Sequence, residues 1–333
     1  MNVVFYQITK PLNIALLKAV IDEKLQELPF TNCSTQEAQR LGFVCAVPGT
    51  ADETSTDEPW HLDLPNALVV RIKEQQKKVS KRAHAKEVER RANLVMEEQG
   101  RRVNKKERQD IKDQVMLEML PRTYPEDRYF AITITSHWVA VPVTGYSAAE
   151  SLLSFIREAL GTFPVIPVRV MNSPEVVMTS WINNGAGPDD DVTLFGTMTL
   201  ADPADDGVRI SCRDIEPFGD EVRAHLEAGR RVTSVGVMIE NLFGAVISSD
   251  LIFKNFQLAE FLQEELEHTK TDTTAAEYAA WHIIMADAMD QAVQCLPRWF
   301  GSDQEVALPA VMTQAQRNEF MQKLSKAMAE DAE

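Results

Sequence analysis

The sequence predicts an α+β protein with antiparallel sheets, ββα-type units and a protruding basic helical hairpin. Short runs of β-branched and aromatic residues alternate with segments of helical periodicity. A pattern of two strands followed by a helix recurs along the chain, and one strongly helix-forming segment concentrates positive charge. With 333 residues, the chain is long enough for two or three hydrophobic cores.

The first 72 residues read as strands around one helix. VVFYQIT, from residue 3, is rich in β-branched and aromatic residues, which favour a strand. Residues 12–28 place apolar side chains at helical spacing, and residues 42–47 and 67–72 are short strands. The polar residues 48–60 between these two strands predict a surface loop.

A two-helix hairpin is predicted next. Residues 73–99 lack Gly and Pro and consist mainly of good helix formers, while Gly100 suits a helix C-terminus. Asn104 and Glu107 have the spacing of a capping box, which predicts a second helix that ends before Pro121. About 22 residues of helix rise roughly 33 Å, so the hairpin is long enough to stand clear of the body.

The remaining chain continues the alternation of strands and helices. The ββα pattern recurs at residues 129–161 and again at 231–267, where a helix is expected through FQLAEFLQEEL. The other expected elements are strands at 165–171, 192–200 and 207–212, helices at 175–182, before Gly229 and at 274–296, and a charged helical tail from 313.

These patterns divide the chain into five expected parts. They are a central α+β domain (1–72 plus 122–165), a basic helical finger (73–121), a base domain (166–230), a third ββα unit with C-terminal helices (231–312) and a charged tail (313–333).

Positive charge is segregated along the chain. Residues 71–112 hold fifteen Lys or Arg against seven Asp or Glu, a net +8, in a chain of formal net charge −16. The other residues therefore carry −24. An acidic protein has no solubility reason to gather cations in one place, so this distribution indicates a binding partner rather than a feature of the fold.

Three interpretations of the basic segment stay open. Binding to a polyanion is favoured, because phosphate contacts need only positive groups spaced along a rod. A solvated hairpin and a docking arm for an acidic protein are the alternatives. The adjacent LPRTY segment offers Arg122 to clamp a phosphate and Tyr124 to stack on a base, although both also fit a plain helix exit.

Other chemistry has little support in the sequence. Asp189, Asp190 and Asp191 are weak support for a metal-dependent nuclease, because they stand in a turn where solvent-facing aspartates are common. Neither a phosphate-binding P-loop nor a G-x-S-x-G motif is present. The four cysteines are expected to be reduced thiols in a cytoplasmic protein, and we expect no secretion signal, no membrane span, no metal and no cofactor.

The sequence resembles the bacterial family of recombination-associated protein RdgC. The stretches that carry the resemblance occur in the family's order over roughly residues 1 to 295. They are PFTNCSTQEAQRLGFV, RRVNKKERQDIKDQVMLEMLPRTY, LGTFPVIPV, MTSWI and HLEAGRRVTSVGV.

The resemblance implies a non-enzymatic protein that forms a ring-shaped homodimer. Members of the family bind duplex DNA without sequence preference, with the DNA threading a positively lined hole, and they limit access of the RecA recombinase. This implies a cytoplasmic, nucleoid-associated protein. The alternatives are a metal-dependent exonuclease or a protein–protein interaction module with a basic arm.

The resemblance also suggests individual DNA-binding residues. The family's arginine and aromatic after the arm fall on Arg122 and Tyr124, and basic arm positions are retained. The family's later basic stretches are reduced to Arg213, followed by Asp214, and to Lys254. The expected DNA-binding set is Arg101, Arg102, Lys105, Lys106, Arg108, Lys112, Arg122, Tyr124 and Arg213.

Overall fold

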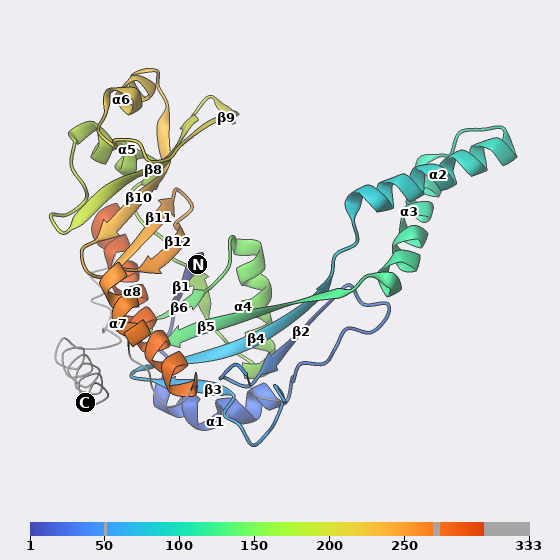
Figure 1. The fold of residues 1–333 in the computed structure, drawn as a ribbon, viewed down its shortest axis with the longest axis horizontal. Coiled ribbons are helices and arrows are strands. Elements are labelled where there is room, and N and C mark those ends of the chain that lie inside the picture. The colour runs from blue at the N-terminus through green and yellow to red at the C-terminus, as the bar shows by residue number, and fades with distance from the viewer. Residues whose placement is uncertain (50–51, 269–273, 303–333) are drawn as a thin grey trace.

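The architecture is α+β, as the sequence predicts. The computed structural model describes residues 1–49, 52–268 and 274–302. One continuous sheet runs through the molecule in the order β2-β4-β5-β6-β1-β12-β11-β10-β8-β9, with β3 paired to β4 and β7 to β1 (Figure 1). The strands are β1 (Val3–Ile8), β2 (Gln39–Val44), β3 (His61–Leu64), β4 (Ala67–Lys77), β5 (Pro125–Thr135), β6 (Trp138–Val141), β7 (Val165–Pro167), β8 (Val192–Asp202), β9 (Asp205–Cys212), β10 (Arg231–Ile239), β11 (Phe243–Ser248) and β12 (Ile252–Leu258).

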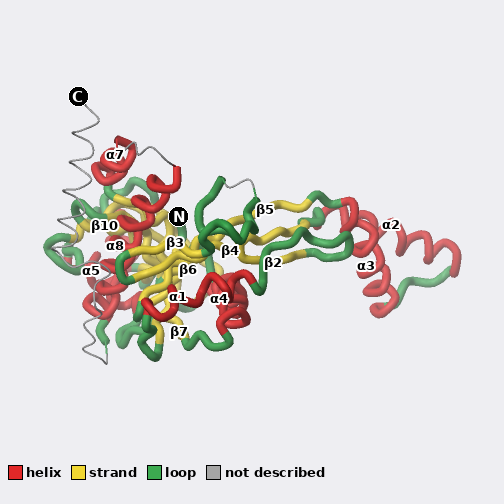
Figure 2. The backbone as a smooth tube through the Cα atoms, turned by 90° about the horizontal axis from the view of Figure 1, so that it is seen from below, coloured by secondary structure: helices red, strands yellow, loops and turns green. Residues whose placement is uncertain are grey.

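The helices lie on the faces of this sheet or project from its end. Figure 2 shows α2 and α3 at one end of the long axis, far from α5 and α8 at the other. The helices are α1 (Ile14–Gln26), α2 (Lys81–Gln99), α3 (Lys105–Met119), α4 (Tyr146–Leu160), α5 (Pro174–Asn184), α6 (Asp220–Glu227), α7 (Glu260–His268) and α8 (Thr274–Phe300), with a short 3-10 helix at Leu120–Arg122. None of the helices in the described ranges is both long enough and apolar enough to span a bilayer.

Strand β1 lies between two hydrophobic cores. Val3 and Phe5 point into one core, whereas Val4 and Tyr6 point into the other, because successive side chains of a strand face opposite sides. Residues from α1 and α4, such as Ile21 and those around Leu152, fill the second core. The first core extends under α5 and α8 to the far end of the sheet.

Buried tryptophans tie α8 to the sheet. Trp138 on β6 donates from Nε1 to Asp290 Oδ1 at 2.7 Å, and Asp290 is fully buried. Near the other end of α8, Trp299 donates from Nε1 to Asp189 Oδ2 at 2.5 Å. These bonds compensate for the loss of solvent around buried polar groups and fix the position of the helix along the sheet.

Two expected elements are different in the structure. Residues 73–77, predicted as the start of the basic helix, continue β4, which pairs with β5 from Ala67 to Lys77. Residues 256–258, predicted as part of a helix, end β12, which pairs with both β1 and β11. The expected tail at 313–333 lies outside the described residues.

Candidate nucleic-acid interface

The arm of helices α2 and α3 is built from strong local signals and a small apolar contact. Ser80 and Asn104 cap the two helices, and Asn104 and Glu107 form the predicted capping box. Gly100 adopts the left-handed conformation (φ 65°) that ends α2, where a side chain would be strained. The helices bury only Val88, Ala92 and Val115. The arm therefore depends on capping and surface pairs more than on a core.

Most arginines of the arm are engaged in ion pairs within it. Arg101 makes two bonds of 2.6 and 2.9 Å to Glu107, so its guanidinium lies against α3. Arg91 bridges the two helices through Glu118 at 2.6 Å. The full set of pairs is Arg90–Glu87, Arg91–Glu87, Arg91–Glu118, Arg101–Glu107 and Arg108–Glu89.

Two glutamates of these pairs, Glu87 and Glu107, have lowered pKa values. Hydrogen bonds from Arg90 and Arg91 lower the pKa of Glu87 to about 2. The Arg101 side chain, and then the backbone N–H of Asn104, lower the pKa of Glu107 to about 2. The two glutamates stay ionised over the whole neutral range, so the paired arginines are not free to bind another anion without exchanging partners.

The other predicted cations of the arm are exposed and unpaired. Among the described residues, Arg102, Lys105, Lys106 and Lys112 form no ion pair, and all four are exposed to solvent. Lys112 and Lys105 stand on the same helix, α3, at a separation of two turns. Arg102 and these three lysines are therefore predicted charges of the arm that are available to a polyanion.

Arg122 and Tyr124 lie where the arm joins β5. Arg122 ends the 3-10 helix, and the Thr123 hydroxyl donates to Met119 O at 3.0 Å, which closes the helix end. Both side chains are exposed, and Tyr124 is 91% exposed. Tyr124 therefore does not pack on the core. Arg122 forms no ion pair with another described residue, and an aromatic ring in water beside such an arginine is suited to stacking and phosphate contact.

Arg71 and Lys73, which were counted in the basic segment, are buried on β4 and are not displayed on the arm. Arg71 and Lys73 are 5% and 8% exposed, on the face of β4 that looks toward the 45–60 loop. Lys73 Nζ lies 2.8 Å from Glu53 Oε2 and 3.0 Å from Asp127 Oδ2. Burial opposes its charge, but hydrogen bonds to Glu53, Tyr129 and Asp127 outweigh burial and raise the pKa of Lys73. The arm thus displays fewer cations than residues 71–112 contain.

A second polar surface covers the opposite end of the sheet. Arg209, Arg231 and Lys254 line a concavity of about 590 Å³ together with Ser and Thr side chains of β8, β10 and β11. Arg213 is exposed just beyond β9, and Asp214 after it has a left-handed backbone. Three carboxylates, those of Glu175, Asp202 and Asp250, also line the concavity and reduce its positive charge.

Sequence reasoning missed Arg209 and Arg231. A signal was present for Arg209, because GVRISC alternates polar and apolar residues, which places Arg209 and Ser211 on one exposed face. Ser234 pairs with Ser248 across β10 and β11, whereas the neighbouring Val235 is in the core. The partners of each arginine on adjacent strands depend on the strand order, which a single sequence does not give.

The two cationic surfaces stand at opposite ends of one crescent. In Figure 1, the arm and the tip of β9 flank the open concave side, and the N-terminus of β1 lies on that side between them. The predicted residues therefore fall into separate groups. Arg101, Arg102, Lys105, Lys106, Arg108 and Lys112 share the arm, Arg122 and Tyr124 mark its base, and Arg213 belongs to the far end.

The aspartates weighed as a nuclease site do not converge. Asp189 Oδ2 accepts from Trp299 and lies 2.7 Å from Arg298 Nη2, so this carboxylate holds α8 in place. Within residues 1–49, 52–268 and 274–302, no group of three or more His, Cys, Asp or Glu side chains is arranged to hold a metal ion. The four cysteines are free thiols.

Fold and surface together define a class: an α+β protein with one antiparallel sheet and a projecting arm that displays unpaired lysines. Residues 1–303 match the family model described as "Putative exonuclease, RdgC", and the chain belongs to the RdgC family. The chain is 26% identical over 307 residues to the recombination-associated protein RdgC of Psychromonas ingrahamii, covering 92% of this chain and 99% of the relative. The protein of the same name from Actinobacillus pleuropneumoniae serotype 3 is 26% identical over 306 residues, 91% of this chain and 98% of the relative. That of Xanthomonas oryzae pv. oryzae is 31% identical over 201 residues, 60% of this chain and 66% of the relative.

Proposed function

We propose that this protein binds double-stranded DNA without sequence preference and so limits the access of a RecA-type recombinase to it. In this role it is not an enzyme, and it is cytoplasmic and nucleoid-associated. The relatives named recombination-associated protein RdgC support a role in recombination. The observation that carries the proposal is the exposed, unpaired group of Arg102, Lys105, Lys106 and Lys112 on an otherwise acidic protein.

The geometry suits contact with phosphates rather than with bases. The arm presents flexible ammonium groups on a helix, and such groups bind phosphate oxygens as point charges. Four arginines of the described arm, Arg90, Arg91, Arg101 and Arg108, are held by glutamates, which limits the bidentate contacts to bases that arginines make in specific complexes. Arg122 with the exposed Tyr124 adds a phosphate clamp and a ring at the base of the arm.

A ring-shaped homodimer completes the proposal. In one crescent, the arm and the surface around Arg209, Arg213 and Lys254 flank the open side, and a second copy closes that side around the duplex. The negative exterior repels DNA and leaves the lined hole as the favourable path. Encirclement holds DNA by topology, so that each local contact can be weak.

The test is DNA affinity as a function of salt concentration. We expect the logarithm of the binding constant for a random duplex to fall linearly with the logarithm of the salt concentration, with a slope of about −0.9 per neutralised phosphate. Replacing Lys105, Lys106 and Lys112 with Gln should weaken binding and make the slope shallower by up to about 3. All three side chains are exposed, so the fold is retained.

A matched control separates local contacts from net charge. Lys10, Lys24 and Arg223 are exposed cations outside the arm, and replacing these three with Gln changes the net charge by the same amount. The control variant should bind duplex DNA much more tightly than the arm variant. Equal losses in both variants, or a flat salt response of the unaltered protein, would contradict the proposal.

The double variant Arg122→Ala, Tyr124→Ala tests the base of the arm. Both side chains lie in solvent, so DNA affinity should fall while the oligomer and its melting temperature are unchanged. The nuclease alternative is tested in parallel by incubating DNA with the protein and Mg²⁺ or Mn²⁺, where we expect no cleavage. Failure of any nucleic acid to bind at low salt would instead favour an acidic protein partner for the arm.

A further inference from the structure

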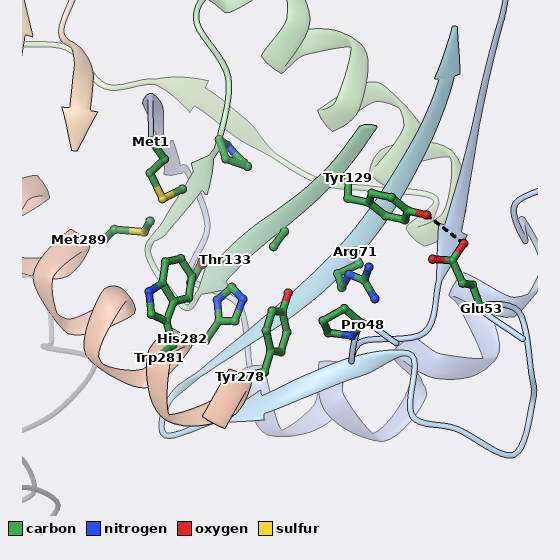
Figure 3. Close-up of a pocket in the computed structure, with 12 residues that line it drawn as sticks. Met1, Pro48, Glu53, Arg71, Tyr129, Thr133, Tyr278, Trp281, His282 and Met289 are labelled. Atoms are coloured by element: carbon green, nitrogen blue, oxygen red, sulfur yellow. Dashed lines mark hydrogen bonds between the residues drawn. The ribbon is translucent and has the colours of Figure 1, made fainter. Parts of the chain in front are cut away.

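A cavity of about 510 Å³ lies between the start of α8 and the strands β4 and β5, away from the arm. Figure 3 shows Arg71 and Tyr129 from the strands facing Tyr278, Trp281 and His282 from the helix across it. Its wall is mostly apolar, with aromatic rings on two sides. Mostly apolar cavities with a few converging polar groups are typical of small-molecule sites.

Arg71 is a buried cation without a counter-charge. Its side chain is on the inner face of β4, the residue is 5% exposed, and Nη1 donates to the carbonyl oxygen of Cys45 at 2.8 Å. The guanidinium carbon lies 5.2 Å from the centroid of the Tyr129 ring. No carboxylate of the described residues forms an ion pair with it. A guanidinium has five N–H donors, so the Cys45 carbonyl uses only part of its capacity.

The carboxylate that also lines the cavity is engaged elsewhere. Glu53 Oε2 lies 2.8 Å from Lys73 Nζ and accepts the Tyr129 hydroxyl at 3.1 Å. Figure 3 shows Glu53 turned toward the Tyr129 hydroxyl at the edge of the cavity. Leaving a charge buried and unpaired is costly, so the arrangement is suited to an anion that enters from outside.

His282 is a second unsatisfied group on the same cavity. It is 4% exposed, and among the described residues its Nε2 has no hydrogen-bond partner. The Tyr278 and Trp281 rings meet it edge-on, with centroids 4.4 and 4.7 Å away. Burial, and then the positive charge of Arg71, lower the pKa of His282 to about 4, so the imidazole is neutral at pH 7. A neutral Nε2 accepts or donates one hydrogen bond, according to the tautomer.

We propose that this cavity binds a small organic anion that carries one carboxylate on a flat, apolar body. The carboxylate pairs with Arg71, the body lies between Tyr129 and the Tyr278–Trp281 side, and His282 Nε2 bonds to a polar atom of the ligand. A monoanion fits better than a phosphate dianion, because Arg71 is the one Lys or Arg side chain that lines the described cavity and the carboxylate of Glu53 is close by. This site is independent of DNA binding.

The probe is 2-naphthoate, titrated into the full-length protein and followed by ligand-observed NMR. We expect saturable binding. The neutral isostere 2-naphthamide should bind at least about tenfold more weakly, because it lacks the charge that pairs with Arg71. No saturable binding of naphthoate, or equal affinity for the acid and the amide, would overturn the proposal. This comparison needs only the unaltered protein.

Variants then locate the site. Arg71→Gln should weaken naphthoate binding at least about tenfold, whereas Arg71→Lys, which keeps a cation, should retain most of it. Arg223→Gln, which removes an exposed arginine from α6, is the matched control and should bind as the unaltered protein does. If the Arg71→Gln variant folds and binds naphthoate with unchanged affinity, the anion binds elsewhere and the assignment is overturned.

Discussion

The strand and helix portions of the basic segment differ in what surrounds their charges. On β4, Arg71 and Lys73 are buried, and Lys73 is fixed between Glu53 and Asp127. On α2 and α3, arginines pair with glutamates in solvent, while Lys105 and Lys106 are unpaired. A run of positive charge along the chain therefore contains structural, neutralised and available cations, and only the last kind can bind a polymer from solution.

The difference predicts that Lys73 of the strand stabilises the fold, whereas Lys105 of the arm has little effect on stability. Lys73→Met leaves Glu53 and Asp127 close together without their shared cation, so we expect the free energy of unfolding to fall by about 2 to 3 kcal/mol. Lys105→Met, on the exposed arm, should change it by less than about 0.5 kcal/mol. Urea denaturation of both variants measures this, and similar losses would show that Lys73 is not structural.

The buried residue His282 should also make the stability of the protein depend on pH. Burial, and then Arg71, lower the pKa of His282 from 6.5 to about 4, so the folded state resists a proton that the unfolded state binds. The contribution of His282 to stability is complete above about pH 6.5 and is lost as the pH falls toward 4, by about 3 kcal/mol. His282→Gln should flatten this part of the stability curve. His84→Gln, on the arm, should leave it in place; if both variants keep the wild-type slope, His282 is not its source.

The smallest expected effect concerns the neutralised arginines of the arm. Glu107→Gln removes the charge that holds Arg101 but keeps a residue that serves in a capping box. DNA affinity should rise a few-fold, and the salt slope should steepen by about 0.9 at most. Glu158→Gln, an exposed carboxylate on α4, is the control for net charge. A gain of equal size in the control would mean that Arg101 contributes no contact of its own.

Capping and turn residues within the segment predicted the two helices of the arm. The strands that the sequence analysis missed are determined by pairing with distant strands. The Asn104–Glu107 capping box and the left-handed Gly100 follow from neighbouring residues and are confirmed. Residues 73–77 are good helix formers, but they form a strand because β2 and β5 flank them on both sides. The end of β12 was missed for the same reason, since its partners β1 and β11 are outside the local window.

Prediction of the candidate site from the sequence is limited in the same way, by contacts between distant residues. Which cations stand in the arm could be predicted from composition, but which of them are free could not. Glu118 neutralises Arg91 from the other helix, 27 positions away along the chain. The burial of Arg71 depends on a helix that begins about 200 residues later. The five-part division of the chain and the ring stay predictions.

Strand β1 occupies the middle of the sheet, yet its neighbours β6 and β12 both come after it in the chain. Its neighbour β6 follows within the first half of the chain, whereas β12, on its other side, is made only at residues 252–258. On that side β7 already pairs with Tyr6 to Ile8, but Val3 and Val4 have no partner strand until β12 is made, and an unpaired edge is a template for pairing with other chains. During synthesis, the protein must therefore protect an unpaired strand edge in the middle of its sheet, whereas folded proteins have such edges at their outermost strands.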